Sequence, residues 1–256
     1  MENVVDVLIV GAGICGLTTA LGLHRLGIRS LVLESSDDLR VTGYALSLWT
    51  NGWKALDAVG IGDSLRQNHD QLDGIITSSM ISGDKTSELL FSAPEEGSGI
   101  IILLDCCLVE IYELVLMGSG VRCVRRKFLL ECLAKALPSG TIKFSSKVVA
   151  IEESGLLKLV HLADGTSIKT KVLIGCDGVK SVVAKWLGFK APAFTGRCAV
   201  RGCLQRESNH NFGRKVSLYA GEGVRAGIIP CDDKTLYWFF SWTPSADGES
   251  TMIKIT

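Results

Sequence analysis

A glycine-rich hexapeptide near the amino terminus constrains the fold more than any other feature of the chain. It reads Gly11-Ala12-Gly13-Ile14-Cys15-Gly16. A β-branched run over 4–10 precedes it, and such a short apolar run bounded by glycine is typical of a buried parallel strand. Apolar residues then recur at helical spacing as far as Gly27, a residue type that often ends a helix. A second apolar run over 30–33 ends on Glu34, so the order predicts a strand, loop, helix and strand that open an α/β domain.

The hexapeptide has the form of a dinucleotide-binding loop. In such a loop the first glycine permits a tight turn, the second lets the backbone approach a pyrophosphate, and the third brings helix and strand together. Gly11, Gly13 and Gly16 occupy these places, and the helix amino terminus faces the anion. Glycine makes up 28 of the 256 residues, so the argument rests on the flanking strands, the helix and Glu34, an acid that can bind a ribose hydroxyl. NAD and FAD share the adenosine half, so the loop alone leaves both cofactors open.

Charge, cysteines and histidines narrow the classes of protein to consider. Lys plus Arg and Asp plus Glu number 27 each, so no net charge favours nucleic acid or an anionic membrane. The nine cysteines form no CxxC pair, which predicts reduced thiols of an intracellular protein. The four histidines lack metal-ligand spacing, so we expect no metal site. The first apolar run has no basic leader, so we expect no secretory signal and, by default, a cytoplasmic location.

An apolar segment over 100–117 imitates a membrane span. It contains Asp105, Glu110 and Glu113, and each acid would cost about 2–3 kcal/mol near the centre of a bilayer. We therefore expect no transmembrane span. Gly-Ser-Gly triplets flank the segment, and we predict an atypical amphipathic or partly disordered insert over 98–120.

The remaining pattern predicts three further helices and a region rich in strands. Helices are expected over 51–59 and 126–137, and strands over 74–81, 88–91, 141–144, 147–151, 158–162, 167–174, 198–205, 216–220, 226–230 and 235–242. Asp164-Gly165 predicts a hairpin turn. The strand over 167–174 leads through Asp177 and Gly178 into a third helix, which begins near Lys180. Asp177 and Gly178 are thus expected at the carboxyl end of a parallel strand, where open sheets bind ligands.

The strand over 235–242 is unusually aromatic. Its alternate residues Leu236, Trp238, Phe240 and Trp242 share one face. Aromatic residues favour half-buried strands, so we expect this face to pack in a core rather than to stack on a ligand.

Three separated segments resemble one family. They read GAGICGLTTALGLHRLGIRSLVLE from Gly11, VRRKFLLECLAKALP from Val124 and GCDGVKSVVAKWLG from Gly175. The chain is similar, over about 4–97 and 121–243, to the FAD-dependent aromatic-ring-hydroxylase type of flavoprotein monooxygenase, and most to the plant group near zeaxanthin epoxidase and salicylate-hydroxylase-like enzymes. The resemblance implies FAD as the tightly held cofactor. It also implies an α/β fold, with a Rossmann-like, three-layer FAD/NAD(P)-binding domain and an incomplete β-rich substrate domain.

The resemblance implies the division into domains as well. The FAD-binding domain would take 1–73 and 121–191, and a partial substrate domain would take 74–97 and 192–256, with the insert between them. The family carries a third FAD motif, a Gly-Asp pair followed by His-Pro, which does not occur before Thr256. We therefore expect a chain truncated relative to the family.

Residue by residue, the resemblance implies a cofactor-binding set. It comprises Gly11, Ala12, Gly13, Ile14, Cys15, Gly16, Glu34, Ser35, Arg40, Arg126, Asp177 and Gly178. Arg126 matches the arginine at the ribityl and phosphate region, where a cation suits a dianionic linker, with its neighbour Arg125 as the alternative. Arg40 would lie near the adenine, while Asp177 and Gly178 would serve flavin and nicotinamide. A role for Asp177 as the N-cap of the helix that follows it is compatible with cofactor binding.

The implied reaction uses NAD(P)H to reduce FAD and dioxygen as the source of an oxygen atom for a small apolar or aromatic substrate. The cofactor carries that chemistry, so no catalytic side chain and no metal are expected. Two alternatives stay open: a truncated, non-catalytic remnant that acts as a binding protein, and an NAD-dependent reductase that would not need Arg126. The sequence leaves the substrate, the choice of NADH or NADPH and the oligomeric state undetermined.

Overall fold

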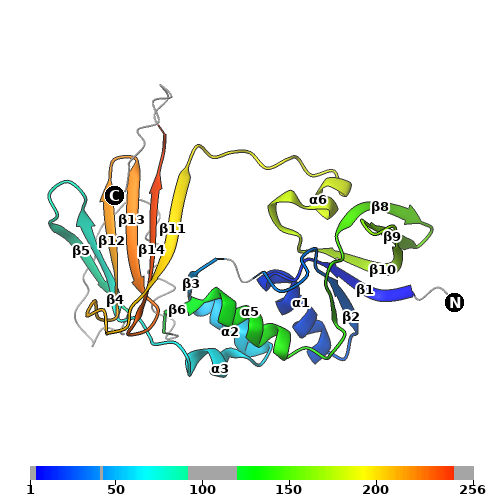
Figure 1. Ribbon diagram of the computed structural model, residues 1–256, viewed down its shortest axis with the longest axis horizontal. Helices are drawn as coiled ribbons and strands as arrows, with labels where there is room; N and C mark the ends of the chain where they lie inside the picture. Colours follow the sequence, from blue (N-terminus) through cyan, green and yellow to red (C-terminus); the bar gives the residue numbers. More distant parts are fainter. Residues whose placement is uncertain (1–3, 41–42, 92–119, 245–256) are drawn as a thin grey trace. The chain divides into compact units, whose positions relative to one another are not determined.

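The computed structural model describes residues 4–40, 43–91 and 120–244, which form two compact units (Figure 1). The first unit takes residues 1–42, 55–65 and 126–193, and the second takes 43–54, 66–125 and 194–256. The predicted insert lies outside the described residues, Gly120 excepted. Within the described ranges no helix is both long and apolar enough to cross a membrane.

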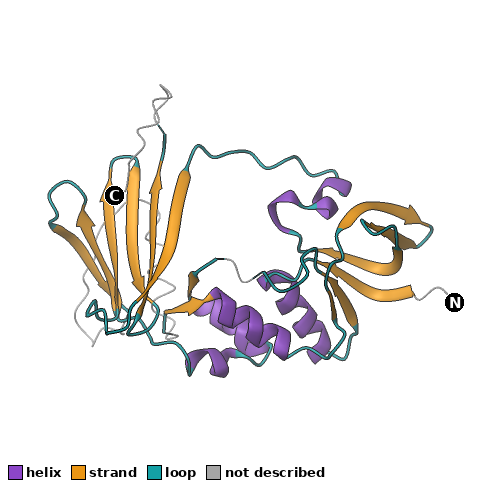
Figure 2. Cartoon of the chain, viewed as in Figure 1, coloured by secondary structure: helices purple, strands orange, loops and turns teal. Residues whose placement is uncertain are grey.

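The first unit contains a mixed six-stranded sheet, whose strands are orange and whose helices are purple in Figure 2. Its strand order is β7-β2-β1-β10-β9-β8. The strands are β1 (Val4–Val10), β2 (Ser30–Leu33), β7 (Ile142–Lys143), β8 (Val148–Ser154), β9 (Leu157–Leu162) and β10 (Ser167–Gly175). The helices are α1 (Ile14–Arg25), α5 (Arg126–Lys135), the 3-10 turn η1 (Gly178–Lys180) and α6 (Val182–Trp186), while α2 (Thr50–Ala58) and α3 (Gly62–Arg66) straddle the unit boundaries. Strands β7, β2, β1 and β10 run parallel, whereas β9 and β8 continue the sheet antiparallel.

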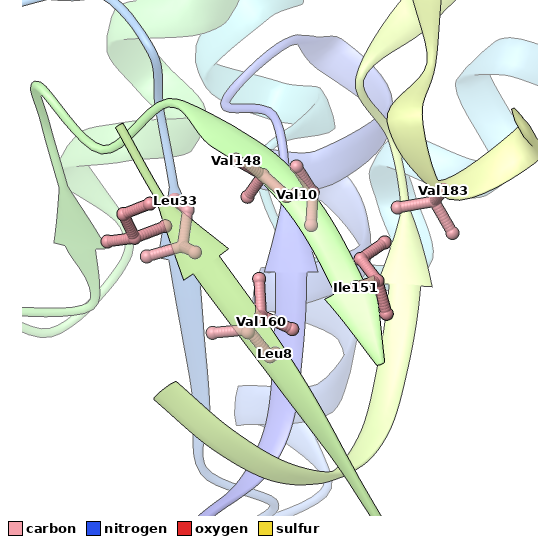
Figure 3. Close-up of a cluster of buried hydrophobic side chains, with 8 residues drawn as sticks. Leu8, Val10, Leu33, Val148, Ile151, Val160 and Val183 are labelled. Atoms are coloured by element: carbon pink, nitrogen blue, oxygen red, sulfur yellow. The ribbon is translucent and has the colours of Figure 1, made fainter. Parts of the chain in front are cut away.

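Both faces of β1 are covered over its last four residues, Val7–Val10, which explains their continuous apolar sequence. On one face, side chains from β1, β2, β8, β9 and α6 point toward one another (Figure 3). This cluster comprises Leu8, Val10, Leu33, Val148, Ile151, Val160, Leu162 and Val183. Helix α1 contacts β1, β2 and α5, and Leu17 and Leu21 of α1 are fully buried. Each such side chain contributes about 1.5–3 kcal/mol on burial, and the layers confirm the predicted α/β fold.

The second unit is a six-stranded sheet with a small two-stranded ribbon. The large sheet has the order β11 (Cys198–Gln205), β14 (Thr235–Trp242), β13 (Val224–Pro230), β12 (Lys215–Gly221), β4 (Gly74–Ser79) and β5 (Lys85–Leu90). Only β12 and β4 pair in parallel among these described strands. The ribbon pairs β3 (Ala45–Leu48) with β6 (Arg122–Arg125).

The structure corrects the predicted core face of β14. Tyr237 and Phe239 pack against the buried cluster of this unit, whereas Trp238 on the predicted core face is 37% exposed. Leu236 alone of the predicted set is buried, at 4% exposure. The prediction is confirmed for Leu236 and wrong for Trp238. Both faces of β14 carry large apolar side chains, and alternation separates two faces without showing which one is covered.

The bounds of the two units differ from the predicted domains. Strand β3 pairs with β6, and the N–H of Leu72 donates to the carbonyl of Val121 at 2.8 Å. Residues 43–54, 66–73 and 121–125 therefore cluster with the second unit, although they were expected in the FAD-binding domain. Such pairings join segments far apart in the chain, and no local pattern reveals them.

Candidate dinucleotide-binding site

Three parallel strands end side by side at the glycine loop. Val10, the last residue of β1, is in register with Leu33 of β2 and with Gly175 of β10. The N–H of Gly11 donates to the carbonyl of Leu33 at 2.7 Å, and the N–H of Cys176 donates to the carbonyl of Val10 at 2.8 Å. The loop, Glu34 and the Cys176-Asp177 segment thus leave adjacent strand ends, which is where open α/β sheets bind ligands.

Two of the loop glycines are required by close backbone packing. Gly11 has φ of +102°, and a side chain there would collide with the carbonyl of Cys176. A side chain on Gly16 would collide with the carbonyl of Gly11. These contacts confirm the tight turn and the close helix–strand approach expected of Gly11 and Gly16. Around Gly13, a Cβ atom would meet nothing within 4 Å, so the backbone there is open to a ligand.

The amino terminus of α1 is equipped for an anion. Its N-cap is Gly13, no side chain caps it, and its first turn holds no acidic residue. The first N–H groups of a helix lack intrahelical partners and carry partial positive charge. Ile14, Cys15 and Gly16 therefore present main-chain donors beside the open space at Gly13, an arrangement that suits a pyrophosphate.

Glu34 is buried at the end of β2 and binds the loop directly. Its Oε2 accepts the N–H of Ala12 at 2.9 Å, and its Oε1 accepts the N–H of Ser36 at 3.0 Å and the hydroxyl of Ser35 at 3.1 Å. Burial acts to raise the pKa of Glu34, but these hydrogen bonds and the charge of Arg40 outweigh it and lower the pKa. The carboxylate is therefore ionised at neutral pH, and it is 3% exposed.

Arg40 and Arg126 join Glu34 in one connected network. Arg40 Nη2 lies 3.4 Å from Glu34 Oε1. The guanidinium Nη1 of Arg126, the first residue of α5, donates to the carbonyl of Arg40 at 2.6 Å. Arg125, the alternative considered from the sequence, belongs to the second unit and has its Nη1 3.9 Å from Asp232 Oδ2. The first unit therefore brings Glu34, Arg40 and Arg126 together and leaves Arg125 out.

Asp177 supports the turn that leads into α6. Its Oδ2 accepts the N–H of Val182 at 2.7 Å, and its Oδ1 accepts the hydroxyl of Ser181. Ser181, rather than Asp177, is the N-cap of α6, and its hydroxyl accepts the N–H of Ala184 at 2.8 Å. Asp177 therefore supports the helix start without occupying the cap position. Asp177 also adjoins the loop, since its Cα lies 3.1 Å from where a Cβ of Gly11 would stand. Gly178 adopts φ of +80°, which is accessible to glycine at little cost.

Sequence reasoning missed two partners in this region. Ser36 supplies a main-chain donor to Glu34, and the signal for it is the run of small polar residues after Glu34. The Sγ atoms of Cys15 and Cys176 lie 3.4 Å apart. Each cysteine falls inside one of the quoted motifs, but neither motif reveals that the two side chains meet.

Comparisons with known proteins identify the family to which the chain belongs. The family described as FAD binding domain matches residues 4–255. Monooxygenase 2 of Arabidopsis thaliana is 50% identical over 254 residues, which make up 99% of this chain and 57% of the relative. An FAD-dependent urate hydroxylase of Mycolicibacterium vanbaalenii is 26% identical over 239 residues, which make up 91% of this chain and 55% of that protein.

Solved structures share the fold. Klebsiella pneumoniae HpxO, crystallised with FAD and uric acid, superposes with a TM-score of 0.76 at 24% identity, covering 94% of this chain and 57% of HpxO. A 2,6-dihydroxypyridine-3-hydroxylase of Arthrobacter nicotinovorans superposes with a TM-score of 0.74 at 18% identity, covering 96% and 58%. The chain thus spans little more than half the length of the relatives that it matches.

Proposed function

The chain belongs to the family of FAD-binding domains, and from that premise we propose that it acts as a flavoprotein monooxygenase whose first unit holds FAD. The observation that carries the proposal is the convergence of an uncapped helix terminus, Glu34, Arg40 and Arg126 around the end of β1. These groups come from three separated parts of the sequence, and they match the needs of a dinucleotide: donors for phosphate oxygens, an acceptor for a ribose and a cation beside a polyanion.

Each group has a distinct proposed task. The first-turn N–H groups of α1 bind the pyrophosphate, with the open backbone at Gly13 allowing close approach. Glu34 Oε2, which among the described residues accepts only the N–H of Ala12, keeps a lone pair for a ribose hydroxyl. Arg126 places positive charge at the linker between adenosine and flavin. Asp177 and Gly178 hold the neighbouring turn, next to Gly11.

FAD, when bound, would take electrons from NAD(P)H and supply an activated oxygen atom derived from dioxygen. The protein would bind, orient and desolvate the reactants. We propose a small apolar or aromatic substrate, held by the second unit as a partial substrate domain. The names of relatives support this class, because they include a urate hydroxylase and a 3-amino-4-hydroxybenzoate 2-monooxygenase.

A cofactor titration tests the proposal. The purified chain is titrated with FAD, and binding is followed by visible absorbance and flavin fluorescence. Arg126→Ala should weaken binding at least about tenfold, since a charge-assisted contact is worth about 1.5–3 kcal/mol. Lys127→Ala is the matched control, because Lys127 is exposed on the same helix and lies 3.8 Å from Glu131. Failure of the wild-type chain to bind FAD would refute the cofactor site.

Turnover separates the enzyme from a binding protein. FAD-loaded chain should oxidise NADH or NADPH, and an aromatic substrate should accelerate that oxidation. Binding of FAD without oxidation of NADH or NADPH would instead support the non-catalytic alternative. That alternative is considered because the chain spans only 57% of the length of Monooxygenase 2. If the chain binds NADH or NADPH and Arg126→Ala leaves that affinity unchanged, the result would support the alternative of an NAD-dependent reductase.

A further inference from the structure

Two cysteines meet beside the glycine loop without being bonded. Cys15 lies in the first turn of α1, and Cys176 directly follows β10. Their Sγ atoms are 3.4 Å apart although the residues are 161 positions apart in the chain. A disulfide needs a sulfur–sulfur distance of about 2.05 Å, so the two atoms must approach by about 1.4 Å. A Cβ on Gly16 would stand 3.4 Å from Cys176 Cβ, so Cys176 packs against the first turn of α1, which also carries Cys15.

The two thiols differ in accessibility. Cys15 is exposed, whereas Cys176 is partly buried. Burial raises the pKa of the Cys176 thiol to about 12, assisted by the hydrogen bond with Cys15. An oxidant in solution therefore reaches Cys15 first. Cys176 remains a neutral thiol, with its Sγ 3.4 Å from the Sγ of Cys15.

We infer that Cys15 and Cys176 are an oxidisable dithiol, which hydrogen peroxide converts to a disulfide across the nucleotide loop. In the first step, the sulfur of Cys15 attacks the peroxide, the O–O bond breaks, and Cys15 becomes a sulfenic acid with release of one water. In the second, the sulfur of Cys176 attacks the sulfur of Cys15, the S–O bond breaks, and the hydroxyl leaves as a second water with the proton of Cys176. The thiol pair loses two electrons, and peroxide gains them.

The chain contains its own control pair. Cys123 and Cys231 have Sγ atoms 3.3 Å apart, but they are 0% and 1% exposed in the core of the second unit. Distance alone would make both pairs equally ready to bridge. Access to dissolved oxidant distinguishes them, because a reactive cysteine must be accessible to its oxidant. Exposed Cys203 contacts Cys231, so the control is the direct bridge between Cys123 and Cys231 and not a bridge to Cys203.

The oxidation is tested on the full chain with a peptide map. The protein is first reduced, freed of reductant and treated briefly with hydrogen peroxide. Remaining thiols are then alkylated at low pH, and the monomer fraction is digested and analysed by mass spectrometry. We expect a cross-linked peptide pair containing Cys15 and Cys176 that dithiothreitol separates, formed at least about tenfold faster than any bridge between Cys123 and Cys231.

Two variants assign the roles. In Cys176→Ser, Cys15 should accumulate as a sulfenic acid that dimedone traps. In Cys15→Ser, Cys176 should remain a thiol under the same exposure. The inference is overturned if Cys15 and Cys176 stay reduced, if they are recovered as separate oxidised acids, or if the buried pair bridges as fast. None of these readouts uses FAD, so the inference goes beyond the proposed function and fails or stands separately from it.

Discussion

The N–H of Ala12 donates to the buried carboxylate of Glu34 at 2.9 Å. This bond joins the glycine loop after β1 to the end of β2, so the acid is part of the loop structure as well as a group for a ribose. Because of this hydrogen bond, a change at Glu34 also removes a contact that holds the glycine loop in place. An ionised carboxylate 3% exposed is stable only where several donors surround it, as they do here.

Glu34→Gln should destabilise the protein by about 1–3 kcal/mol at pH 7, because an amide accepts the same hydrogen bonds more weakly and brings its own donors. The folded-state pKa of Glu34 is lowered from its ordinary 4.5. Its contribution to stability is therefore complete above that value and is lost as pH falls through the lower folded pKa. Urea unfolding from pH 7 to pH 3 should show the two proteins converging. Asp37→Asn, on the exposed neighbour, is the control, and a gap independent of pH would contradict the assignment.

Glycine substitutions should separate binding from folding. Gly16→Ala forces a Cβ against the carbonyl of Gly11 and should cost about 1–3 kcal/mol in unfolding free energy. Gly13→Ala meets no atom within 4 Å and has an ordinary backbone φ of −74°, so stability should hold while FAD affinity falls. Thermal unfolding and FAD titration measure the two effects. An unaltered affinity in Gly13→Ala would show that the ligand does not approach there.

Asp177→Ala should loosen the start of α6. The substitution removes the acceptor of the Val182 N–H and of the hydroxyl of Ser181, the residue that caps α6. It should cost about 1 kcal/mol, the typical net value of a hydrogen bond. Asp177→Asn retains an acceptor oxygen and should cost less. Chemical denaturation compares the two variants. Equal losses in both would mean that the carboxylate charge, rather than these hydrogen bonds, is what matters.

Glu88 should titrate far below an ordinary glutamate. Its hydrogen bonds to Lys215 and then Lys85 lower the pKa of Glu88 to about 2, and Lys215 Nζ lies 2.6 Å from Oε1. Lys215→Met should raise this pKa toward 4.5, and by more than Lys85→Met does. Carbon-detected NMR of the side-chain carboxyl follows the titration. The reverse order of the two variants would refute the ranking of the partners.

The packing of the Trp238 ring should depend on the absence of a side chain at Gly202, the residue opposite it. Gly202 pairs with Trp238 across β11 and β14, and a Cβ on Gly202 would stand 2.8 Å from the indole ring. Gly202→Ala should therefore displace the ring and cost about 1–3 kcal/mol. In Trp238→Leu the same glycine change should cost less, so a double-mutant cycle should give a coupling energy of about 0.5 kcal/mol or more. Additive effects would show that the ring does not pack over the glycine.

Local sequence pattern was sufficient for many elements. Strands β11 and β14 begin and end at the predicted residues, Cys198–Gln205 and Thr235–Trp242, because turn-forming residues bound their apolar runs. The sequence also predicted the glycine loop, the strand before it and the helix after it. In these segments the φ/ψ preferences of neighbouring residues and a period of 2.0 or 3.6 already specify the structure.

Tertiary packing decided the relations between those segments. It selected Tyr237 and Phe239 rather than Trp238 for the core. It also joined Arg126 to Arg40 and set Cys15 against Cys176. Each of these contacts spans residues far apart in the chain or chooses between two equally apolar faces, so its free energy depends on what lies opposite. The residues next to it in sequence do not reveal that partner. The contact forms only once the sheets have paired and their cores have packed.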